Sequence, residues 1–487
     1  MTRLTGYMLF AISLAHAQGD YATAGSDAHR SSWVRSDPKI NPTSMQKPGF
    51  EFLWKVKTGS NSLTPAPLMA RYIGYRGFRE FAFIAGNSDK VFAFDTGLGH
   101  VEWQKALTSK QGVCGMTANL ARAVIATFPG TGGRGGGGGG RANYAKSAVS
   151  EPDEGAVTLK EAQARLAAAA ANAGRRGPAP GRGGPALPSI FAPHREYVYA
   201  ISSDGMLHSL LVSNGEEPDA PIHFVPANSS ARGLTVVNNI AYVTTASTCG
   251  GAADTISALD LASKEVASWK GAVAGAIGPA FGPDGALYVA TREGELVALE
   301  AKTLKVRDVY KAGVPFTSSP VIFQSKDATT IAAAAKDGRI HVIDTAKLAG
   351  PAIQSEVITD DPDRASGALA SWQDAAGTRY ILGSVGTAVV ALKMMESGLQ
   401  IAWTAPDIAS PLTPLVVNGV VFTASKGDRA KPSVLYALDG ATGMRLWNSG
   451  TSIGSYVQGG GISAVGSQVF LGTQDGMFYA FGFPIEH

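Results

Sequence analysis

The stretch Ser433-Val-Leu-Tyr-Ala-Leu-Asp-Gly-Ala-Thr-Gly-Met-Arg-Leu-Trp447 decides the fold of this chain. It has the pattern of a β-strand that ends at Asp439, a turn built on Gly443, and a second strand that ends in a tryptophan. The stretch from Lys90 to Trp103 repeats the same order of strand, glycine turn and tryptophan strand. A hairpin pattern that returns so far away in the sequence indicates an internal structural repeat.

Weaker copies of this hairpin recur along the chain, and tight-turn dipeptides precede several of them. Asp204-Gly205, Asp337-Gly338 and Asp475-Gly476 are the clearest of these turns. Eight hairpin turns can be counted, and seven of the eight steps between them fit a period of roughly 40–50 residues. This is the length of a four-stranded blade, so the sequence predicts an all-β, eight-bladed β-propeller.

The two ends of the chain complement each other. The last copy ends at Phe481 without an outer tryptophan strand, whereas Phe50-Glu-Phe-Leu-Trp54 supplies such a strand without a preceding copy. Joining them would complete one blade from both termini and close the ring, which leaves no exposed sheet edge. The sequence therefore predicts a propeller over residues 50–487, preceded by a lead-in over residues 18–49.

The first 17 residues have the pattern of an export signal. Arg3 provides a positive start, residues 8–14 form a short apolar core, and Ala15-His16-Ala17 is a small-x-small cleavage site. The alternative is a buried N-terminal strand or helix. The pattern predicts a periplasmic or secreted bacterial protein, in which disulfides can form. The net charge of +3 gives no reason to expect a nucleic-acid partner, and no later segment has the length and apolarity of a membrane span.

One step of the repeat is too long, and the excess lies in residues 129–193. This segment contains a glycine run over residues 135–140, a stretch of good helix formers from Leu159, and further Gly, Ala and Arg. It predicts a flexible insertion within the second blade, with a transient helix. Contact with RNA or an anionic surface is the alternative reading of its arginines, but a solvated insertion is favoured.

The repeat resembles the docking motif of PQQ-type propeller repeats, Ala-x-Asp-x-x-Thr-Gly-x-x-x-Trp. The 433–447 copy matches it in full, while Leu98 replaces the Thr in the 90–103 copy. Lys264 stands at a Gly position and Lys393 at an Asp position of two weaker copies. Outside the insertion, the chain from about Ser26 to its end is similar to bacterial PQQ-binding-like propeller proteins.

The motif has a structural purpose. The tryptophan of the outer strand fills the wedge between neighbouring blades, the Ala leaves room for its ring, and the Thr-Gly turn needs a permissive backbone. The motif is therefore evidence for the fold and says little about chemistry. The tryptophans expected to dock blades in this way are Trp54, Trp103, Trp269, Trp403 and Trp447.

The resemblance implies two classes of function. Quinoprotein dehydrogenases of this fold hold PQQ near the propeller axis, with a carboxylate base, a Ca²⁺ bound by Glu, Asn and Asp oxygens, and an Arg over the quinone. Many of them also have a ring of adjacent cysteines, which this sequence lacks, and it has no Cys-x-x-Cys-His for a haem. Related outer-membrane assembly scaffold proteins instead bind other proteins.

We therefore expect a binding or scaffold protein that takes a protein, a peptide or a small-molecule ligand at the propeller face. The alternative is an alcohol or sugar dehydrogenase that depends on PQQ and Ca²⁺ and passes electrons to a separate carrier. A hydrolase or lyase at the axial funnel is a third hypothesis, for which the sequence offers no motif. No metal ligands or catalytic residues can be assigned, and a monomer is expected because a closed propeller has no need to oligomerise.

Loops between blades and loops between the second and third strands share one face of a propeller. Cys114 enters the second blade and Cys249 lies in a widened second-to-third loop of the third, so both fall on this face. We predict a structural disulfide between them, and two free thiols are the alternative.

The same face gathers charged residues, which are candidates for a cofactor, anion or substrate site at the funnel. Ordinary solvated loop charge is the favoured interpretation of them. The histidines show no spacing that supports a catalytic triad, and Ser202 with Asp204 is interpreted as turn chemistry. The candidates are Lys110, Arg232, Arg292, Lys336, Lys426, Asp428 and Arg429.

Overall fold

The structure is a computed structural model, and the residues that it describes lie within 18–141 and 196–487. The predicted signal (residues 1–17), the predicted insertion (129–193), Lys110, Cys114 and Cys249 lie outside the described residues. The residues that the structure describes are 20–58, 64–74, 77–85, 89–107, 119–124, 196–246, 254–325, 328–365, 367–396, 398–457 and 461–484.

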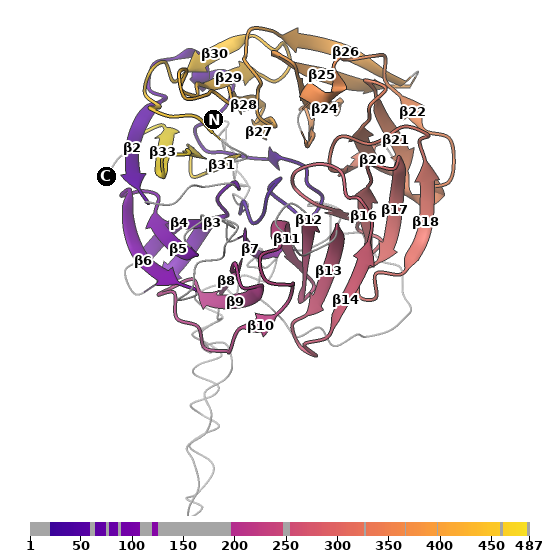
Figure 1. The fold of residues 1–487 in the computed structure, drawn as a ribbon. Helices are drawn as coiled ribbons and strands as arrows, with labels where there is room; N and C mark the ends of the chain where they lie inside the picture. Colours follow the sequence, from indigo (N-terminus) through magenta and orange to yellow (C-terminus); the bar gives the residue numbers. More distant parts are fainter. Residues whose placement is uncertain are drawn as a thin grey trace, which may run out of the picture. The chain divides into compact units, whose positions relative to one another are not determined.

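The described residues form β-strands and three short 3₁₀ helices, so the all-β prediction is confirmed. Five sheets are antiparallel and four-stranded, with successive strands of the chain side by side in four of them (Figure 1). The helices are Ser44–Gln46, Thr345–Lys347 and Pro362–Arg364. The four sequential sheets are β3 (Leu68–Gly74), β4 (Gly77–Ala85), β5 (Lys90–Asp95) and β6 (His100–Ala106); β15 (Ala280–Phe281), β16 (Ala286–Ala290), β17 (Glu295–Glu300) and β18 (Val306–Lys311); β19 (Val321–Ser325), β20 (Ala328–Ala334), β21 (Ile340–Asp344) and β22 (Ile353–Gln354); and β23 (Ala370–Gln373), β24 (Arg379–Val385), β25 (Ala388–Met395) and β26 (Gly398–Ala405).

The fifth four-stranded sheet joins both ends of the chain. The N-terminal strand β2 pairs antiparallel with the C-terminal strand β33, with Trp54 opposite Ala480. The other two strands of this sheet come from the C-terminal part of the chain. Its strands, in spatial order, are β2 (Glu51–Lys57), β33 (Met477–Gly482), β32 (Gln468–Gly472) and β31 (Ile462–Val465).

The two remaining sheets each contain a parallel pair. In the eight-stranded sheet, β7 pairs parallel with β11 and thereby joins two antiparallel groups of four strands. In the five-stranded sheet, β1 pairs parallel with β27, with Trp33 opposite Val416. The eight strands are β10 (Ile222–His223), β9 (Met206–Leu211), β8 (Tyr197–Ile201), β7 (Asn119–Val124), β11 (Ser230–Val237), β12 (Ile240–Ala246), β13 (Thr255–Asp260) and β14 (Val266–Lys270); the five are β1 (Trp33–Val34), β27 (Leu415–Val417), β28 (Val420–Ala424), β29 (Leu435–Asp439) and β30 (Arg445–Asn448).

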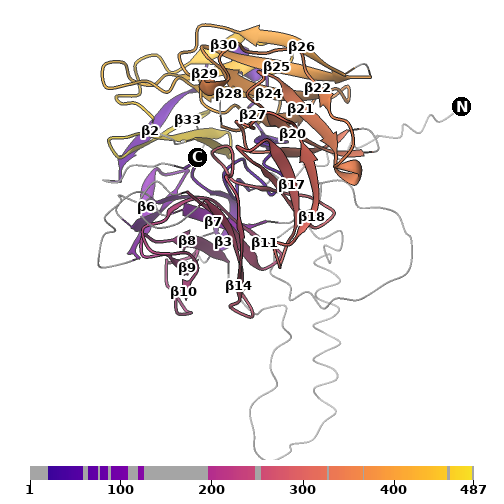
Figure 2. The same ribbon diagram turned by 45° about the vertical axis from the view of Figure 1, so that its right-hand side comes forward.

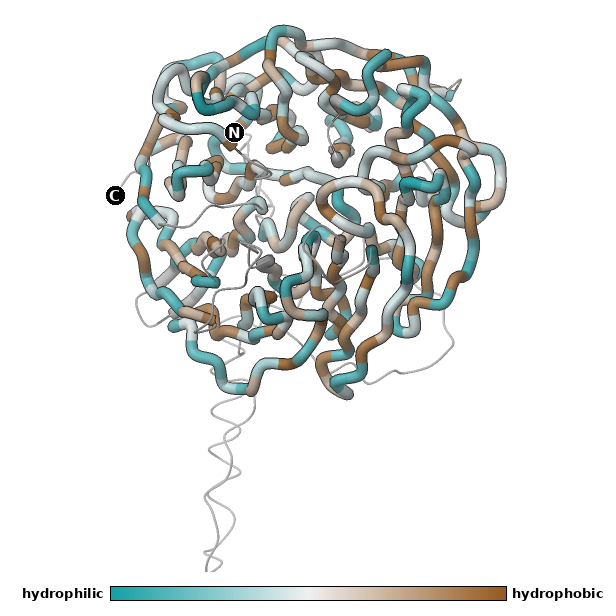
Figure 3. Tube along the Cα trace, in the orientation of Figure 1, coloured by the Kyte–Doolittle hydropathy of each residue, from teal (hydrophilic) through white to brown (hydrophobic). Residues whose placement is uncertain are grey.

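The position of a strand within its sheet follows from its sequence. The second strands β16 and β28 are continuous apolar runs and are buried along their whole length, as expected for strands covered on both faces. The outer strands β14 and β18 contain exposed charged residues. Figure 3 shows this distribution, with hydrophobic residues in the strands and hydrophilic residues frequent at the periphery of the view. The hydrophobic core lies between neighbouring sheets, as in the cluster that joins β4 and β5 to β8 and β9.

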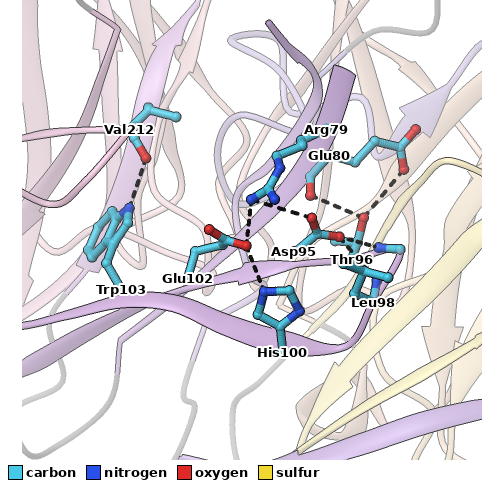
Figure 4. Close-up of polar contacts among 10 residues, drawn as sticks. Arg79, Glu80, Asp95, Thr96, Leu98, His100, Glu102, Trp103 and Val212 are labelled. Atoms are coloured by element: carbon cyan, nitrogen blue, oxygen red, sulfur yellow. Dashed lines mark hydrogen bonds and ion pairs between the residues drawn. The ribbon is translucent and has the colours of Figure 1, made fainter. Parts of the chain in front are cut away.

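The predicted docking tryptophans contact the neighbouring sheet. Trp103 of β6 donates a hydrogen bond from Nε1 to the carbonyl oxygen of Val212, at 2.8 Å (Figure 4). Trp54 of β2 donates to Thr96 at 3.1 Å, and Trp403 of β26 donates to Gly440 at 3.0 Å. In each pair the indole also faces a glycine with a positive φ, so that a side chain there would collide with the ring. These glycines are Gly99, Gly215 and Gly443.

Two other tryptophans have different neighbours. Trp269 of β14 packs in one cluster with Leu304, which takes a φ of +55° at the turn position held elsewhere by glycine. Trp447 of β30 packs edge-on against Phe50, with ring centroids 4.9 Å apart. Phe50 also contacts Phe483, so the two ends of the chain together cover this last tryptophan.

Within the described part of the chain, no helix has the length and apolarity needed to cross a membrane.

Candidate functional site

The N-terminal segment, residues 20–39, connects the sheets to one another. It runs through the middle of the view in Figure 1 as an indigo trace, and Figure 2 shows the same ribbon turned by 45°. Its hydrogen bonds reach the first strands of seven groups of four strands in chain order, and then the turn between β31 and β32 of the last group. The pairs are Tyr21 with Leu68 of β3, Ala22 with Arg122 of β7, Thr23 with Leu234 of β11, Ala28 with Phe281 of β15, His29 with Ile322 of β19, Ser31 with Ser371 of β23, Ser32 with Val416 of β27, and Asp37 with Ser467 between β31 and β32.

Arg30 is the central anchor of this segment and is fully buried. Its guanidinium donates to the carbonyl oxygens of Pro279, Ala24 and Gly233 at 2.9, 2.6 and 2.9 Å, and to the hydroxyl of Thr23 at 2.9 Å. Burial lowers the pKa of Arg30 to about 10, against the opposing effect of the Asp27 charge. The four hydrogen bonds compensate for the loss of water around the cation.

A cavity of about 330 Å³ lies beside the N-terminal segment, which contributes Tyr21, Ala24, Gly25 and Ser32 to its wall. We call it the central cavity. The rest of its wall comes mainly from loops that lead into the first strands of the sheets, and these loops are rich in Gly, Pro, Ser and Thr. The remaining wall residues are Thr64, Pro65, Gly233, Ala276, Ile277, Asp363, Ala365, Gly367, Ser410, Pro411, Leu412, Thr413, Pro414, Leu415, Lys426, Gly461 and Ile462.

Two charged side chains, Asp363 and Lys426, belong to the described wall of the central cavity. Asp363 forms an ion pair with Lys336, with 3.1 Å between Oδ1 and Nζ, and both side chains are about half exposed or more. Lys426 is exposed, and its backbone holds the loop through hydrogen bonds to Ser410 and from Val457. Lys336 and Lys426, both candidates from the sequence, thus lie at this cavity.

Arg232 and Arg292, also candidates from the sequence, are brought together around Asp254. Arg292 forms an ion pair with Asp254 and donates to the carbonyl oxygen of Val273 at 3.0 Å. Burial lowers the pKa of Arg232, and the neighbouring charge of Arg292 lowers it further, while Asp254 raises it. This group is a partly neutralised cationic cluster.

The last two candidates are turn residues. Asp428 accepts hydrogen bonds from the backbone N–H groups of Ala430 and Lys431 at 2.7 and 2.8 Å, and these bonds lower the pKa of its carboxyl group. Arg429 is exposed in the same turn. The interpretation of these charges as ordinary loop chemistry fits Asp428 directly.

Among the described residues, no group of three or more His, Cys, Asp or Glu side chains is placed to hold a metal ion.

Sequence reasoning missed one hydrogen-bonded chain of catalytic type. The hydroxyl of Ser202 lies 2.9 Å from Nε2 of His208, and Nδ1 of His208 lies 2.9 Å from Oε1 of Glu217. This is the order of groups in a Ser-His-acid triad. However, Ser202 and His208 are both buried, and the hydroxyl also bonds to Asp204.

A second sheet shows that this arrangement belongs to the hairpin. His341 lies 2.9 Å from Asp337 through Nε2 and 3.1 Å from the hydroxyl of Tyr310 through Nδ1, with no serine involved. In both sheets the His follows the Asp of an Asp-Gly turn by four residues, as at Asp204 and His208. That spacing was the available signal, and its recurrence identifies the network as part of the repeat rather than as an active site.

Comparisons with known proteins identify this repeat. A family model described as outer membrane protein assembly factor BamB matches residues 252–481. No curated protein matches the sequence. The fold is similar to that of quinohemoprotein alcohol dehydrogenase from Comamonas testosteroni, with a TM-score of 0.58 and 13% identity over 96% of this chain and 81% of that chain.

The match over residues 252–481 and the fold are consistent with a PQQ-like repeat protein.

Two further structures share this PQQ-like β-propeller fold. The quinohemoprotein alcohol dehydrogenase ADHIIG from Pseudomonas putida HK5 has a TM-score of 0.58 and 12% identity, over 96% of this chain and 81% of that chain. A europium-containing methanol dehydrogenase has a TM-score of 0.57 and 11% identity, over 95% of this chain and 98% of that chain. At such identities the likeness shows the fold and leaves the function of this PQQ-like repeat protein open.

The described wall of the central cavity does not fit PQQ with Ca²⁺. A hard cation such as Ca²⁺ takes six to eight oxygen ligands, most of them from carboxylates and amide side chains. The described wall contains no Glu, Asn or Arg, and its one carboxylate, Asp363, is paired with Lys336. No step of a reaction is therefore derived through this cofactor.

Proposed function

We propose that this protein is an exported binding or scaffold protein built as a closed ring of eight blades. Three observations support the ring. Each group of four strands accounts for one blade, with the eight-stranded sheet counted as two because β7 and β11 join two such groups. The pairing of β2 with β33 supplies one blade from both ends of the chain. The N-terminal segment bonds to all eight groups in order.

The proposal that the protein binds rather than catalyses rests on one observation, the place of the N-terminal segment. Residues 20–34 of the chain lie between the first strands of the groups and bond to them. They also form part of the central cavity wall. What is left is a small cavity lined by backbone-rich loops. Gly and Pro in such loops let the main chain of a ligand approach closely, which suits an extended peptide segment of a partner protein.

The family description supports a protein partner, because it names an assembly factor. Export is supported by the sequence pattern of residues 1–17, which would place the protein in the periplasm or outside the cell. Because a closed ring leaves only short, protected sheet edges, the protein would act as a monomer.

The first test is calorimetric titration of the mature protein with PQQ, with and without Ca²⁺. The proposal expects no saturable binding under either condition. Tight binding that requires Ca²⁺ and is lost in Lys426→Ala, but is kept in the control Arg429→Ala, would replace it with the dehydrogenase alternative. Alcohols and sugars would then be assayed with an artificial electron acceptor.

The second test looks for the partner directly. A photo-crosslinking amino acid is placed at Ser410 on the central cavity, and at Val306, an exposed residue of the outer strand β18, as the matched control. In native cells we expect a discrete adduct from position 410 and none from position 306. Equal patterns from both positions would contradict a partner at the cavity.

A further inference from the structure

A second group of charged residues lies away from the central cavity. Residues Ala365 and Gly367, before β23, belong to the cavity wall, whereas Arg379 begins β24 after the turn at the other end of β23. Arg379 therefore lies at the opposite end of this strand from the cavity. The N-terminal segment reaches the same region, because Arg35 follows β1.

Two guanidinium groups lie near one aromatic ring in this region. The guanidinium carbon of Arg35 lies 4.0 Å from the ring centroid of Trp33, and that of Arg379 lies 5.5 Å from the same centroid. Arg379 also lies 5.6 Å from the ring of Phe323 on β19. Cation–π contact stabilises each cation, yet it leaves the hydrogen-bonding groups of both guanidiniums available.

Arg379 is buried, and its hydrogen bonds do not fully replace the water that its guanidinium group loses on burial. Its side chain is 8% exposed, and its Nη2 donates one long hydrogen bond of 3.3 Å to Gln373. Its buried Nε has no hydrogen-bond partner within the described part of the protein. A buried charge with unsatisfied hydrogen-bond donors lowers the free energy of unfolding unless another group bonds to it.

The pKa values of Arg35 and Arg379 are both lowered, which also indicates positive charge without a compensating acid. Burial lowers the pKa of Arg379 to about 10, and the second cause is the positive charge of Arg35. Burial also lowers the pKa of Arg35, and only the Asp27 charge opposes this change. Over the described ranges, neither guanidinium forms an ion pair with an Asp or Glu side chain. Two like charges thus lie close together without an acid between them.

Arg30 shows how this protein buries an arginine that needs no ligand. Its donors are directed at three carbonyl oxygens and a hydroxyl, all within 2.9 Å. Arg379 has no such set of acceptors, although it is nearly as buried. The difference between the two arginines is the observation that calls for a missing partner.

We propose that Arg35 and Arg379 form a binding site for an oxyanion, a carboxylate or a phosphate group, held over Trp33. The planar fork of a guanidinium matches both groups in geometry, and one anion between two forks would neutralise their repulsion. Guanidinium N–H groups of both arginines would donate to the bound anion. This site is separate from the central cavity and stands whether or not the proposed function holds.

The test compares phosphate and acetate at constant ionic strength, by calorimetric titration of the full chain. Saturable binding is expected for at least one anion, and the anion that binds identifies its chemical source as phosphate or carboxylate. Arg35→Gln and Arg379→Gln should each weaken it at least about tenfold. Arg445→Gln is the matched control, because Arg445 also lies over an aromatic ring, Tyr436 at 4.8 Å, but is exposed.

Two further variants keep the result decisive. Arg379→Lys preserves the charge and covers the case in which Arg379→Gln fails to fold. Asp327 lies outside the described residues, in the two-residue gap between β19 and β20, and Asp327→Asn tests it as an internal partner. Absence of saturable binding by both anions in the unchanged protein overturns the proposal. So does anion binding that appears only in Asp327→Asn, because the acid would then fill the site.

Discussion

The indole of Trp403 lies directly over the backbone of Gly443, so that a β-carbon added to Gly443 would be 2.5 Å from Cε3 of the ring. Gly443 also has a φ of +72°, which is unfavourable for any residue with a side chain. The glycine of this turn is thus required for two reasons. The turn needs glycine for its backbone, and the preceding sheet needs glycine for its tryptophan.

Gly443→Ala should therefore destabilise the protein by more than the backbone strain alone. Gly285→Ala is the matched control, because Gly285 has a φ of +79° with nothing within 4 Å of the added carbon. We expect a loss of roughly 1 kcal/mol for the control and at least about 1 kcal/mol more for Gly443→Ala. Chemical denaturation measures both, and equal losses would show that the ring contact contributes nothing.

Glu80 should make the stability depend on pH. The pKa of Glu80 is raised to about 7. Burial is the main cause, and the charges of Asp37 and Asp95 act in the same direction, while the hydrogen bond from Thr96 lowers the pKa (Figure 4). The folded protein then holds a proton that the unfolded chain releases above its usual pKa of 4.5. Stability should therefore fall as the pH rises from about 4.5 to 7, by up to about 3 kcal/mol.

Glu80→Gln provides the measurement, because glutamine cannot ionise. Unfolding free energies of the two proteins, determined between pH 4.5 and 7.5, should diverge with rising pH in favour of the variant. Glu51→Gln is the matched control, since Glu51 of β2 is an exposed glutamate. Parallel curves for the unchanged protein and Glu80→Gln would assign no role to this carboxyl group.

Arg30→Met should be among the most destabilising single changes. It removes four hydrogen bonds at once and leaves buried acceptors at Pro279, Ala24 and Gly233 without a donor. We expect a loss of at least about 3 kcal/mol. Arg307→Gln, at an exposed arginine 3.4 Å from Asp284, should cost no more than about 0.5 kcal/mol. Similar melting temperatures for the two variants would mean that the N-terminal segment is dispensable.

The sequence predicted the blades well because their determinants are local. A hairpin such as Ala437 to Trp447 carries its strand pattern, turn glycine and docking tryptophan within a few residues of each other. The all-β class and the PQQ-like repeat follow from such stretches. The network at His208 was also local, and the Asp-Gly-x-x-His spacing would have revealed it.

The path of the N-terminal segment could not be predicted in the same way. Its partners are backbone groups up to hundreds of residues away, as in the bond of Asp37 to Ser467. Backbone donors and acceptors, such as the N–H of Ser467 that donates to the Asp37 carboxylate, carry no sequence signature. Arg35 and Arg379 are equally distant in sequence, and only the fold places both over Trp33. The fold also separates the charged loop residues that the sequence offered as site candidates. Lys336 and Lys426 lie at the cavity, whereas Arg232 lies beside Arg292.

The joining of the two chain ends can be tested at Phe50. Its ring lies 4.9 Å from Trp447, 5.5 Å from Phe483 and 5.6 Å from Phe422, so it binds the N-terminal strand to the C-terminal part of the chain. Phe50→Ala should cost about 3–5 kcal/mol, because the side chain is buried and the cavity has little freedom to collapse. Phe52→Ala, two residues further along in β2 and at 38% exposure, should cost roughly 1 kcal/mol. Chemical denaturation measures both variants. Equal losses of unfolding free energy would contradict a role for Phe50 in joining the two ends of the chain. A larger loss for Phe50→Ala would show that the last blade depends on both ends.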